Sequence, residues 1–151
     1  MSRKNAPGLP LPSKSAYALI TGASQGIGKA MAIDLAQRGH NVILVARREE
    51  VLREIATDIE RKYQVDAEVL AADLSVEGDV ERVVEYMADK EISIIINSAG
   101  IASFGKFVNA DWDYETNQYN LNATAVFRLT KAALDQMIPR GSGAICNVGS
   151  A

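Results

Sequence analysis

Largely apolar runs alternate with amphipathic segments along most of this chain. Runs of this kind are typical of strands buried in a parallel sheet, and they are found at residues 17–20, 41–46, 67–72, 92–96 and 143–148. Between them, apolar residues recur at the spacing of one helix face, which predicts helices at residues 29–36, 49–63, 80–87 and 112–137. Because strands and helices alternate, the pattern predicts an α/β fold with helices on both faces of a parallel sheet.

The connection between the first strand and the first helix is rich in glycine. Glycines allow a tight turn, a close approach of the backbone to a pyrophosphate, and close packing of the helix on the strand. The phosphates would lie at the N-terminus of the helix, where unpaired N–H groups and the helix dipole favour negative charge. We therefore predict a dinucleotide-binding turn, with contacts from Thr21, Gly22, Ser24, Gln25, Gly26, Ile27 and Gly28.

Two arginines follow the second predicted strand. Arg47 and Arg48 lie about twenty residues after the glycines, where an acidic side chain would bind the ribose 2′-hydroxyl of NAD. Guanidinium groups are suited instead to bidentate contact with a 2′-phosphate, so the sequence favours NADP as the cofactor. The alternative is that both arginines are solvated residues at the start of the next helix.

Length and charge narrow the possible functions. The 151 residues are enough for one domain with a sizeable core, and the net charge of −3 gives no basic excess that would suggest nucleic acid. No apolar run approaches the length of a membrane span, so no membrane partner is predicted. Residues 1–14 contain three of the four prolines and no apolar signal-peptide core. We interpret them as a flexible arm before a dinucleotide-binding domain at 15–151.

Cysteine and histidine are too few for a disulfide framework or a metal centre. Cys146 is the only cysteine, which predicts a cytoplasmic setting, and its apolar neighbours predict a small buried thiol. His40 is the only histidine and lies in a turn between a helix and a strand. We expect it to be structural or solvated, and we expect no metal site.

The glycine turn and the polar residues after the third and fourth strands together resemble motifs of the short-chain dehydrogenase/reductase family. The turn is similar to the family's T-G-x-x-x-G-x-G, Asp73-Leu74 resembles the segment whose aspartate contacts the adenine ring, and Asn97 to Gly100 resembles its N-N-A-G. The resemblance covers residues 15–151. It implies a Rossmann-like, doubly wound sheet with strand order 3-2-1-4-5, truncated after the fifth strand. It also implies cofactor contacts from Asp73, Leu74, Asn97, Ala99 and Gly100.

Two residues match catalytic positions of the family. Asn122 resembles the asparagine that holds a water of the proton relay, and Ser150 resembles the serine that hydrogen-bonds the substrate oxygen. Each polar residue also has a simpler interpretation. Asp73 would be a helix cap, 97–100 a strand-ending turn, Asn122 a surface residue and Ser150 a loop residue.

The family's Tyr-x-x-x-Lys pair follows the serine, and this chain stops at Ala151 before reaching it. In the family the tyrosine donates a proton as the hydride arrives, and the lysine lowers the pKa of the tyrosine. Tyr86 to Lys90 matches the pattern literally, but it precedes the fourth strand, at the edge of the sheet away from the ligand-binding edge. We therefore expect the chain to be a fragment that shows no significant carbonyl reduction and is prone to association.

The resemblance implies an NADP-dependent oxidoreductase that transfers hydride between NADP(H) and a small-molecule carbonyl or secondary alcohol. The full-length protein is expected to be a homo-oligomer. The alternative is a catalytically silent NADP-binding or interaction module. Phe104, Phe107 and Trp112 either form one wall of the substrate pocket or, more simply, pack in the core.

Overall fold

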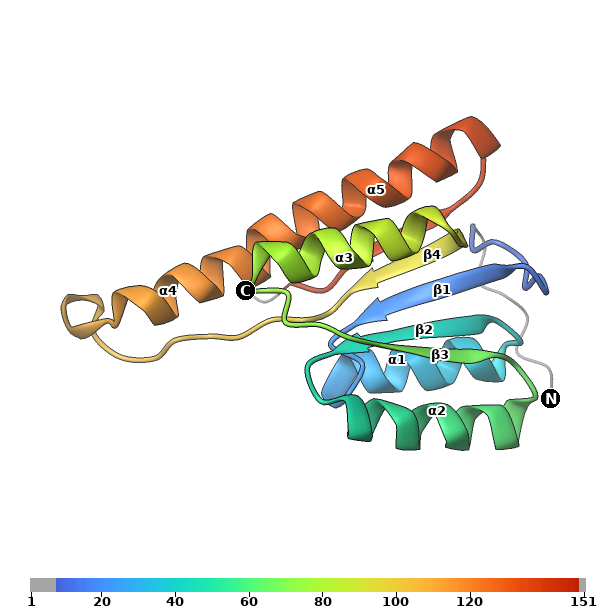
Figure 1. Ribbon diagram of the computed structural model, residues 1–151, viewed down its shortest axis with the longest axis horizontal. Coiled ribbons are helices and arrows are strands. Elements are labelled where there is room, and N and C mark those ends of the chain that lie inside the picture. The colour runs from blue at the N-terminus through green and yellow to red at the C-terminus, as the bar shows by residue number, and fades with distance from the viewer. Residues whose placement is uncertain (1–7, 150–151) are drawn as a thin grey trace.

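Five parallel strands form one sheet in residues 8–149, the part of the chain that the computed structural model describes. The strands are β1 (Ala16–Thr21), β2 (Asn41–Ala46), β3 (Ala67–Ala71), β4 (Glu91–Asn97) and β5 (Ala144–Asn147). Their order is β3-β2-β1-β4-β5, and every neighbouring pair is parallel. The predicted α/β fold and its strand order 3-2-1-4-5 are therefore confirmed (Figure 1).

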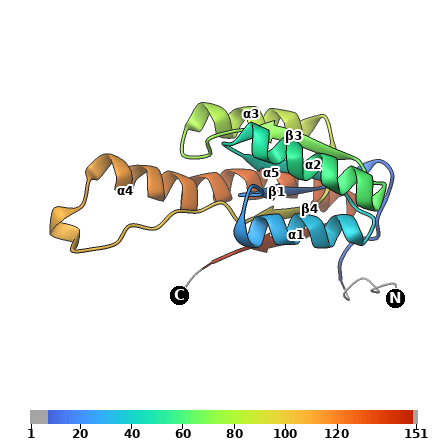
Figure 2. The same cartoon turned by 90° about the horizontal axis from the view of Figure 1, so that it is seen from below.

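Helices cover both faces of this sheet. α1 (Gly26–Gln37) and α2 (Glu49–Tyr63) pack on one face, and α3 (Glu77–Ala88) and α5 (Ala125–Arg140) pack on the other (Figures 1 and 2). Side chains alternate along each strand, so Ala18 and Ile20 of β1 face α1 and α2, whereas Leu19 faces α3 and α5. Both faces of the central strands are buried, which is why their sequences are continuous apolar runs.

The helix predicted at 112–137 extends further and is interrupted. α4 (Trp112–Tyr119) continues into a π-helical segment, η2 (Asn120–Thr124), and then into α5, which ends at Arg140. The interruption contains Asn122, whose side chain accepts a hydrogen bond from Ile101 N (3.1 Å) and donates one to Ile101 O (2.7 Å). A π-helical turn is rare and frequently lies at a functional site.

The interpretation of Phe104, Phe107 and Trp112 as core residues is wrong. Their exposed fractions are 97%, 79% and 75%, and α4 has no buried residue. The loop after β4, which contains the short 3-10 helix η1 (Phe107–Asn109), extends with α4 past the carboxyl ends of the strands (Figure 1). Within the described residues no strand lies beneath them there, so these side chains have no apolar surface of the sheet to pack against.

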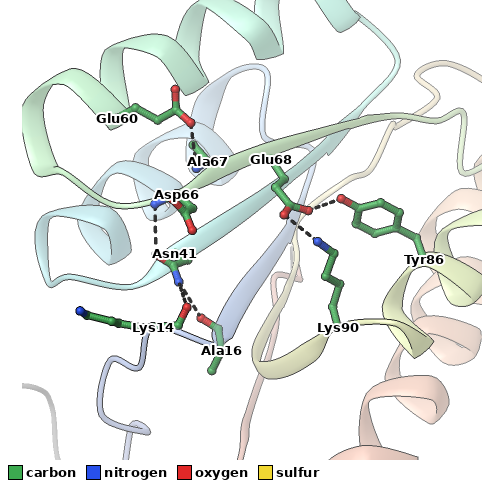
Figure 3. A network of polar contacts seen from close by, with 9 residues as sticks. All are labelled: Lys14, Ala16, Asn41, Glu60, Asp66, Ala67, Glu68, Tyr86 and Lys90. Carbon is green, nitrogen blue, oxygen red and sulfur yellow. Dashed lines mark hydrogen bonds and ion pairs between the residues drawn. The ribbon is translucent and has the colours of Figure 1, made fainter.

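Polar side chains connect the strands at their amino ends (Figure 3). Asn41, at the start of β2, donates to the backbone oxygens of Lys14 (3.1 Å) and Ala16 (3.4 Å) and accepts from the N–H of Asp66 (3.1 Å). Leu9 packs against the apolar cluster formed with α1 and α2. At Leu9 and Lys14, the segment predicted as a flexible arm therefore contacts the body of the domain.

Cysteine and histidine differ in burial. Cys146 in β5 is half-buried, not fully buried as predicted, because β5 is an edge strand of the sheet. His40 is almost completely buried. Residues 8–149 contain no group of three or more His, Cys, Asp or Glu side chains that could hold a metal ion. In the same residues, none of the helices has the length and apolarity needed to cross a membrane.

Candidate cofactor site

A cavity of about 660 Å³ lies at the carboxyl ends of the strands. The chain leaves β1 toward β2 on one side, while β4 lies on the other side of β1, so this edge contains the point at which the strand order reverses. Ligands of doubly wound sheets bind in the crevice at that point. Most of the predicted cofactor contacts line the cavity, namely Gly22, Ser24, Gln25, Gly26, Ile27, Arg47, Arg48, Asp73, Leu74, Ala99 and Gly100.

Two glycines of the turn have different roles. Gly28 does not line the cavity, because it packs α1 against the turn, and a Cβ there would lie 2.4 Å from Gly22 O. Gly26 lines the cavity with a left-handed backbone (φ +57°), and a Cβ built on it would meet no atom within 4 Å. The open space beside Gly26 is therefore where a ligand phosphate can approach the backbone closely.

Thr21 and Asn97 do not line the cavity and lie behind the residues that form its wall. The Thr21 hydroxyl accepts from Ser98 N and Ala99 N, both at 3.0 Å, and so fixes the turn after β4 against β1. Asn97 is buried and donates to Thr130 Oγ1 (3.1 Å) and Asn147 Oδ1 (2.8 Å). In this structure, both residues position the loops that form the wall.

The N-terminus of α1 faces the cavity without a side-chain partner. Its N-cap residue, Gln25, makes no capping hydrogen bond with its side chain, and the first turn contains no acidic residue. Helix N-termini bind anions through free N–H groups and the helix dipole. This start of α1 is therefore suited to a phosphate.

The two arginines differ in their contacts. Both are exposed and line the cavity. Arg48 Nη2 donates to Gln25 Oε1 (2.8 Å) and Ser24 Oγ (3.3 Å) across the mouth of the glycine turn. Arg47 forms no hydrogen bond or ion pair with the described residues, so its guanidinium is available to a ligand. The interpretation of both as merely solvated residues does not account for the Arg48 contacts.

Asp73 turns the chain after β3 but does not cap a helix. Its carboxylate accepts from the Ser75 N–H (3.0 Å) and hydroxyl (2.7 Å), whereas α3 begins later, with Val76 as its N-cap. The helix-cap interpretation of Asp73 is therefore wrong, because the tight turn at Ser75 separates it from α3. Leu74 is buried and forms part of the cavity wall.

Of the two candidate catalytic residues, the structure places Asn122, and Ser150 lies outside the described residues. The two hydrogen bonds from Asn122 to the Ile101 backbone hold the segment after β4 beside η2. A Cβ on Gly100 would lie 3.2 Å from Asn122 Oδ1, so the contact between the segments is close. Asn122 is exposed, as its interpretation as a surface residue expects, and it does not line the cavity, but its side chain holds Ile101, which does. Its catalytic role stays a prediction.

Some residues that line the cavity were not predicted from the sequence. Ile101, Leu121 and Val148 also line the cavity. Val148 is the last residue of the strand predicted at 143–148, and Ile101 directly follows the predicted segment 97–100, so their positions near strand ends were the available signal. Leu121 is brought in by the π-helical segment, which the apolar periodicity of the helix does not reveal.

Tyr86 and Lys90 lie at the opposite edge, near the amino ends of β3 and β4 (Figure 3). The Tyr86 hydroxyl donates to the carboxylate of Glu68 on β3, and Lys90 Nζ lies 2.7 Å from the same carboxylate. Burial, reinforced by Glu68, raises the pKa of Tyr86, so the phenol keeps its proton. This arrangement connects secondary-structure elements and is separate from the cavity.

Comparisons with known proteins agree with this geometry. The model of the short chain dehydrogenase family matches residues 16–151. The chain is 34% identical over 139 residues to very-long-chain 3-oxoacyl-CoA reductase-B of Danio rerio, covering 89% of this chain and 45% of that protein.

Two solved structures extend the comparison. The bulky-bulky ketone specific alcohol dehydrogenase from Comamonas testosteroni superposes with a TM-score of 0.88 at 36% identity, over 92% of this chain and 56% of the other. A short-chain dehydrogenase from Sphingobium yanoikuyae, solved in complex with NADPH, gives a TM-score of 0.87 at 38% identity, over 90% and 54%. The chain thus spans about half the length of the relatives it matches.

Proposed function

This chain belongs to the short-chain dehydrogenase family, and from that premise we propose that its cavity binds NADP(H) for an oxidoreductase acting on a carbonyl or secondary alcohol. One observation carries the proposal. The uncapped N-terminus of α1 and the exposed side chains of Arg47 and Arg48 line the same cavity. A helix N-terminus is suited to the pyrophosphate, and guanidinium groups are suited to a 2′-phosphate. The NADPH complex of the Sphingobium yanoikuyae relative supports this choice of cofactor.

The bound nicotinamide would supply or accept the hydride, and the residues of this chain would bind and orient it. The N–H groups at the start of α1 would receive the pyrophosphate, and Asp73 and Leu74, which line the cavity, would contact the adenine. Asn122 holds the Ile101 backbone, which lines the wall nearest η2. Ser150 is proposed to hydrogen-bond the substrate oxygen in the whole protein.

Properties of the whole protein are also proposals. We propose a small-molecule carbonyl or alcohol as its substrate, because the relatives include a 3-oxoacyl-CoA reductase and a ketone-specific alcohol dehydrogenase. The cytoplasmic setting and the homo-oligomeric state stay predictions. Within residues 1–151 the one Tyr-x-x-x-Lys sequence, Tyr86 to Lys90, binds Glu68 away from the cavity, so we expect a polypeptide of these residues alone to bind NADPH without reducing ketones.

Calorimetric titration of the chain with NADPH and NADH tests the cofactor assignment. We expect NADPH to bind more tightly, because only NADPH carries the 2′-phosphate. The double variant Arg47→Asp, Arg48→Ala should lose most of that difference, about 1–3 kcal/mol for charge-assisted contacts. Equal affinities of the unmodified chain for the two cofactors would contradict the assignment.

A further inference from the structure

We propose that Arg48 is a positioning residue that holds the Gln25 side chain away from the start of α1, while Arg47 alone recognises the 2′-phosphate. The inference rests on the proposed NADP(H) site and assigns different tasks to two neighbouring arginines. They follow β2 in succession and both line the cavity, so their positions in the sequence do not separate them.

The contacts of Gln25 carry the first half of the proposal. Gln25 is the N-cap of α1, and its side-chain oxygen accepts from Arg48 Nη2 at 2.8 Å instead of from the helix. At an N-cap, the side-chain oxygens of Ser, Thr, Asp and Asn accept from the N–H groups of the first turn, and the proposal is that the Gln25 oxygen does the same when Arg48 is absent. Arg48 thus occupies the acceptor that would otherwise compete with a phosphate for these N–H groups.

The second contact of Arg48 fixes the other side of the turn. The same Nη2 lies 3.3 Å from Ser24 Oγ, and Arg48 is itself the N-cap of α2. One guanidinium therefore connects the start of α2 to two consecutive residues before the start of α1. This connection acts on the pyrophosphate-binding turn, which NADPH and NADH use equally.

Arg47 is in a different situation. It is exposed, lines the cavity, and makes no hydrogen bond or ion pair with any described residue. A guanidinium that is free in this way can form a bidentate contact with a phosphate without breaking an existing contact. Because NADH lacks the 2′-phosphate, the contribution of Arg47 should be restricted to NADPH.

Single variants titrated with both cofactors separate the two roles. Arg48→Ala should weaken NADPH and NADH by the same factor, about fivefold for the loss of one exposed charge-assisted contact. Arg47→Ala should weaken NADPH and leave NADH unchanged. Arg53→Ala is the matched control, since Arg53 lies on α2 but pairs with Glu49 outside the cavity. Thermal unfolding of each variant confirms that the fold is retained.

A double-mutant cycle tests whether Arg48 acts through Gln25. In the Gln25→Ala background no competing oxygen remains, so adding Arg48→Ala should change the affinity for either cofactor much less than it does in the unmodified chain. An Arg48→Ala effect confined to NADPH, or one undiminished by Gln25→Ala, would overturn the proposal. If the unmodified chain bound no NADPH at all, the proposed function itself would fail.

Discussion

At Gly26, both the backbone conformation and the proposed ligand require a residue without a side chain. Its left-handed φ of +57° and the open space beside it suit a glycine at the phosphate-binding turn. We expect Gly26→Val to abolish NADPH binding, because a β-branched side chain would fill the approach to the turn. Gly141→Val is the matched control, since Gly141 has φ +68° and open space but lies at the end of α5. Calorimetry on folded variants checks this, and NADPH binding by Gly26→Val at the unmodified affinity would place the phosphates elsewhere.

His40 gives the chain a measurable dependence on pH. Burial, followed by the charge of Arg38, lowers the pKa of His40, and its Nε2 has no hydrogen-bond partner in residues 8–149. The folded state therefore binds fewer protons than the unfolded state. The stability contributed by neutral His40 is complete above the unfolded pKa of about 6.5 and is lost as pH falls below it.

Urea unfolding at a series of pH values tests this role of His40. We expect the free energy of unfolding to fall from about pH 7 to about pH 5, and the variant His40→Gln to lose most of that slope. The lowered pKa values of Glu68 and Glu81 affect stability only as these carboxylates protonate, below about pH 4.5. An unchanged slope in His40→Gln would show that another group is responsible.

Single residues show where sequence reasoning reached its limit. The glycine turn, Arg47 and Asp73 were found at the cavity because a motif fixes their distance from the end of a strand. The same motif could not say that Thr21 and Asn97 point behind the wall, since side chains alternate at strand ends and the turn decides which face they reach. Partners 33 or more residues away in the sequence, such as Thr130 for Asn97, settle that direction.

At the scale of elements, strands were predicted better than the long helix. Buried strands and the helix at Glu49–Tyr63 have apolar patterns that arise from the layers they lie between. The π-helical segment instead contains Asn122, whose side chain contacts Ile101 in the loop after β4. Apolar periodicity contains no information on such a contact, so the interruption could not be predicted from it.

The docking of α5 on β4 and α3 depends on Gln136. Its side chain accepts from the buried Ile92 N–H (3.1 Å) and donates to Met87 O (2.6 Å). We expect Gln136→Met to lower the free energy of unfolding by about 1–3 kcal/mol, because it removes the partner of the buried Ile92 N–H and one of the hydrogen bonds to Met87 O, which still accepts from Lys90 N. Asp135→Asn is the control on the same helix, as Asp135 is exposed and pairs with Lys131 at the surface. Urea denaturation measures both, and equal effects would contradict a specific role for Gln136.

In the whole molecule, polar residues at the carboxyl ends of the strands and those at the amino ends have different roles. Parallel strands bring all carboxyl ends to one side, where the loops of Gly26, Arg47 and Asp73 meet around the cavity. At the amino edge, Asn41 and Glu68 bind neighbouring segments (Figure 3). The topology could be predicted from the alternating pattern, so the separation of the two edges followed from the sequence, even though individual contacts did not.

The apolar surface of the whole molecule predicts self-association of the 151-residue chain. Phe104 and Phe107 are 97% and 79% exposed on the projecting loop, and among the described residues β5 pairs with β4 alone, leaving its other edge open. Exposed apolar groups and open strand edges both favour association. We expect the sedimentation coefficient to rise with protein concentration.

The double variant Phe104→Ser, Phe107→Ser should reduce that rise, because it removes both exposed phenylalanines from the loop without touching the core. Leu11→Ser is the control, since Leu11 is 77% exposed and lies in the segment before β1. Residual association of the double variant would then come from the open edge of β5 or from the apolar side chains that stay exposed, such as Val108 and Trp112. Sedimentation velocity measures all three chains, and a monodisperse monomer of the unmodified chain at every concentration would show that neither surface drives association.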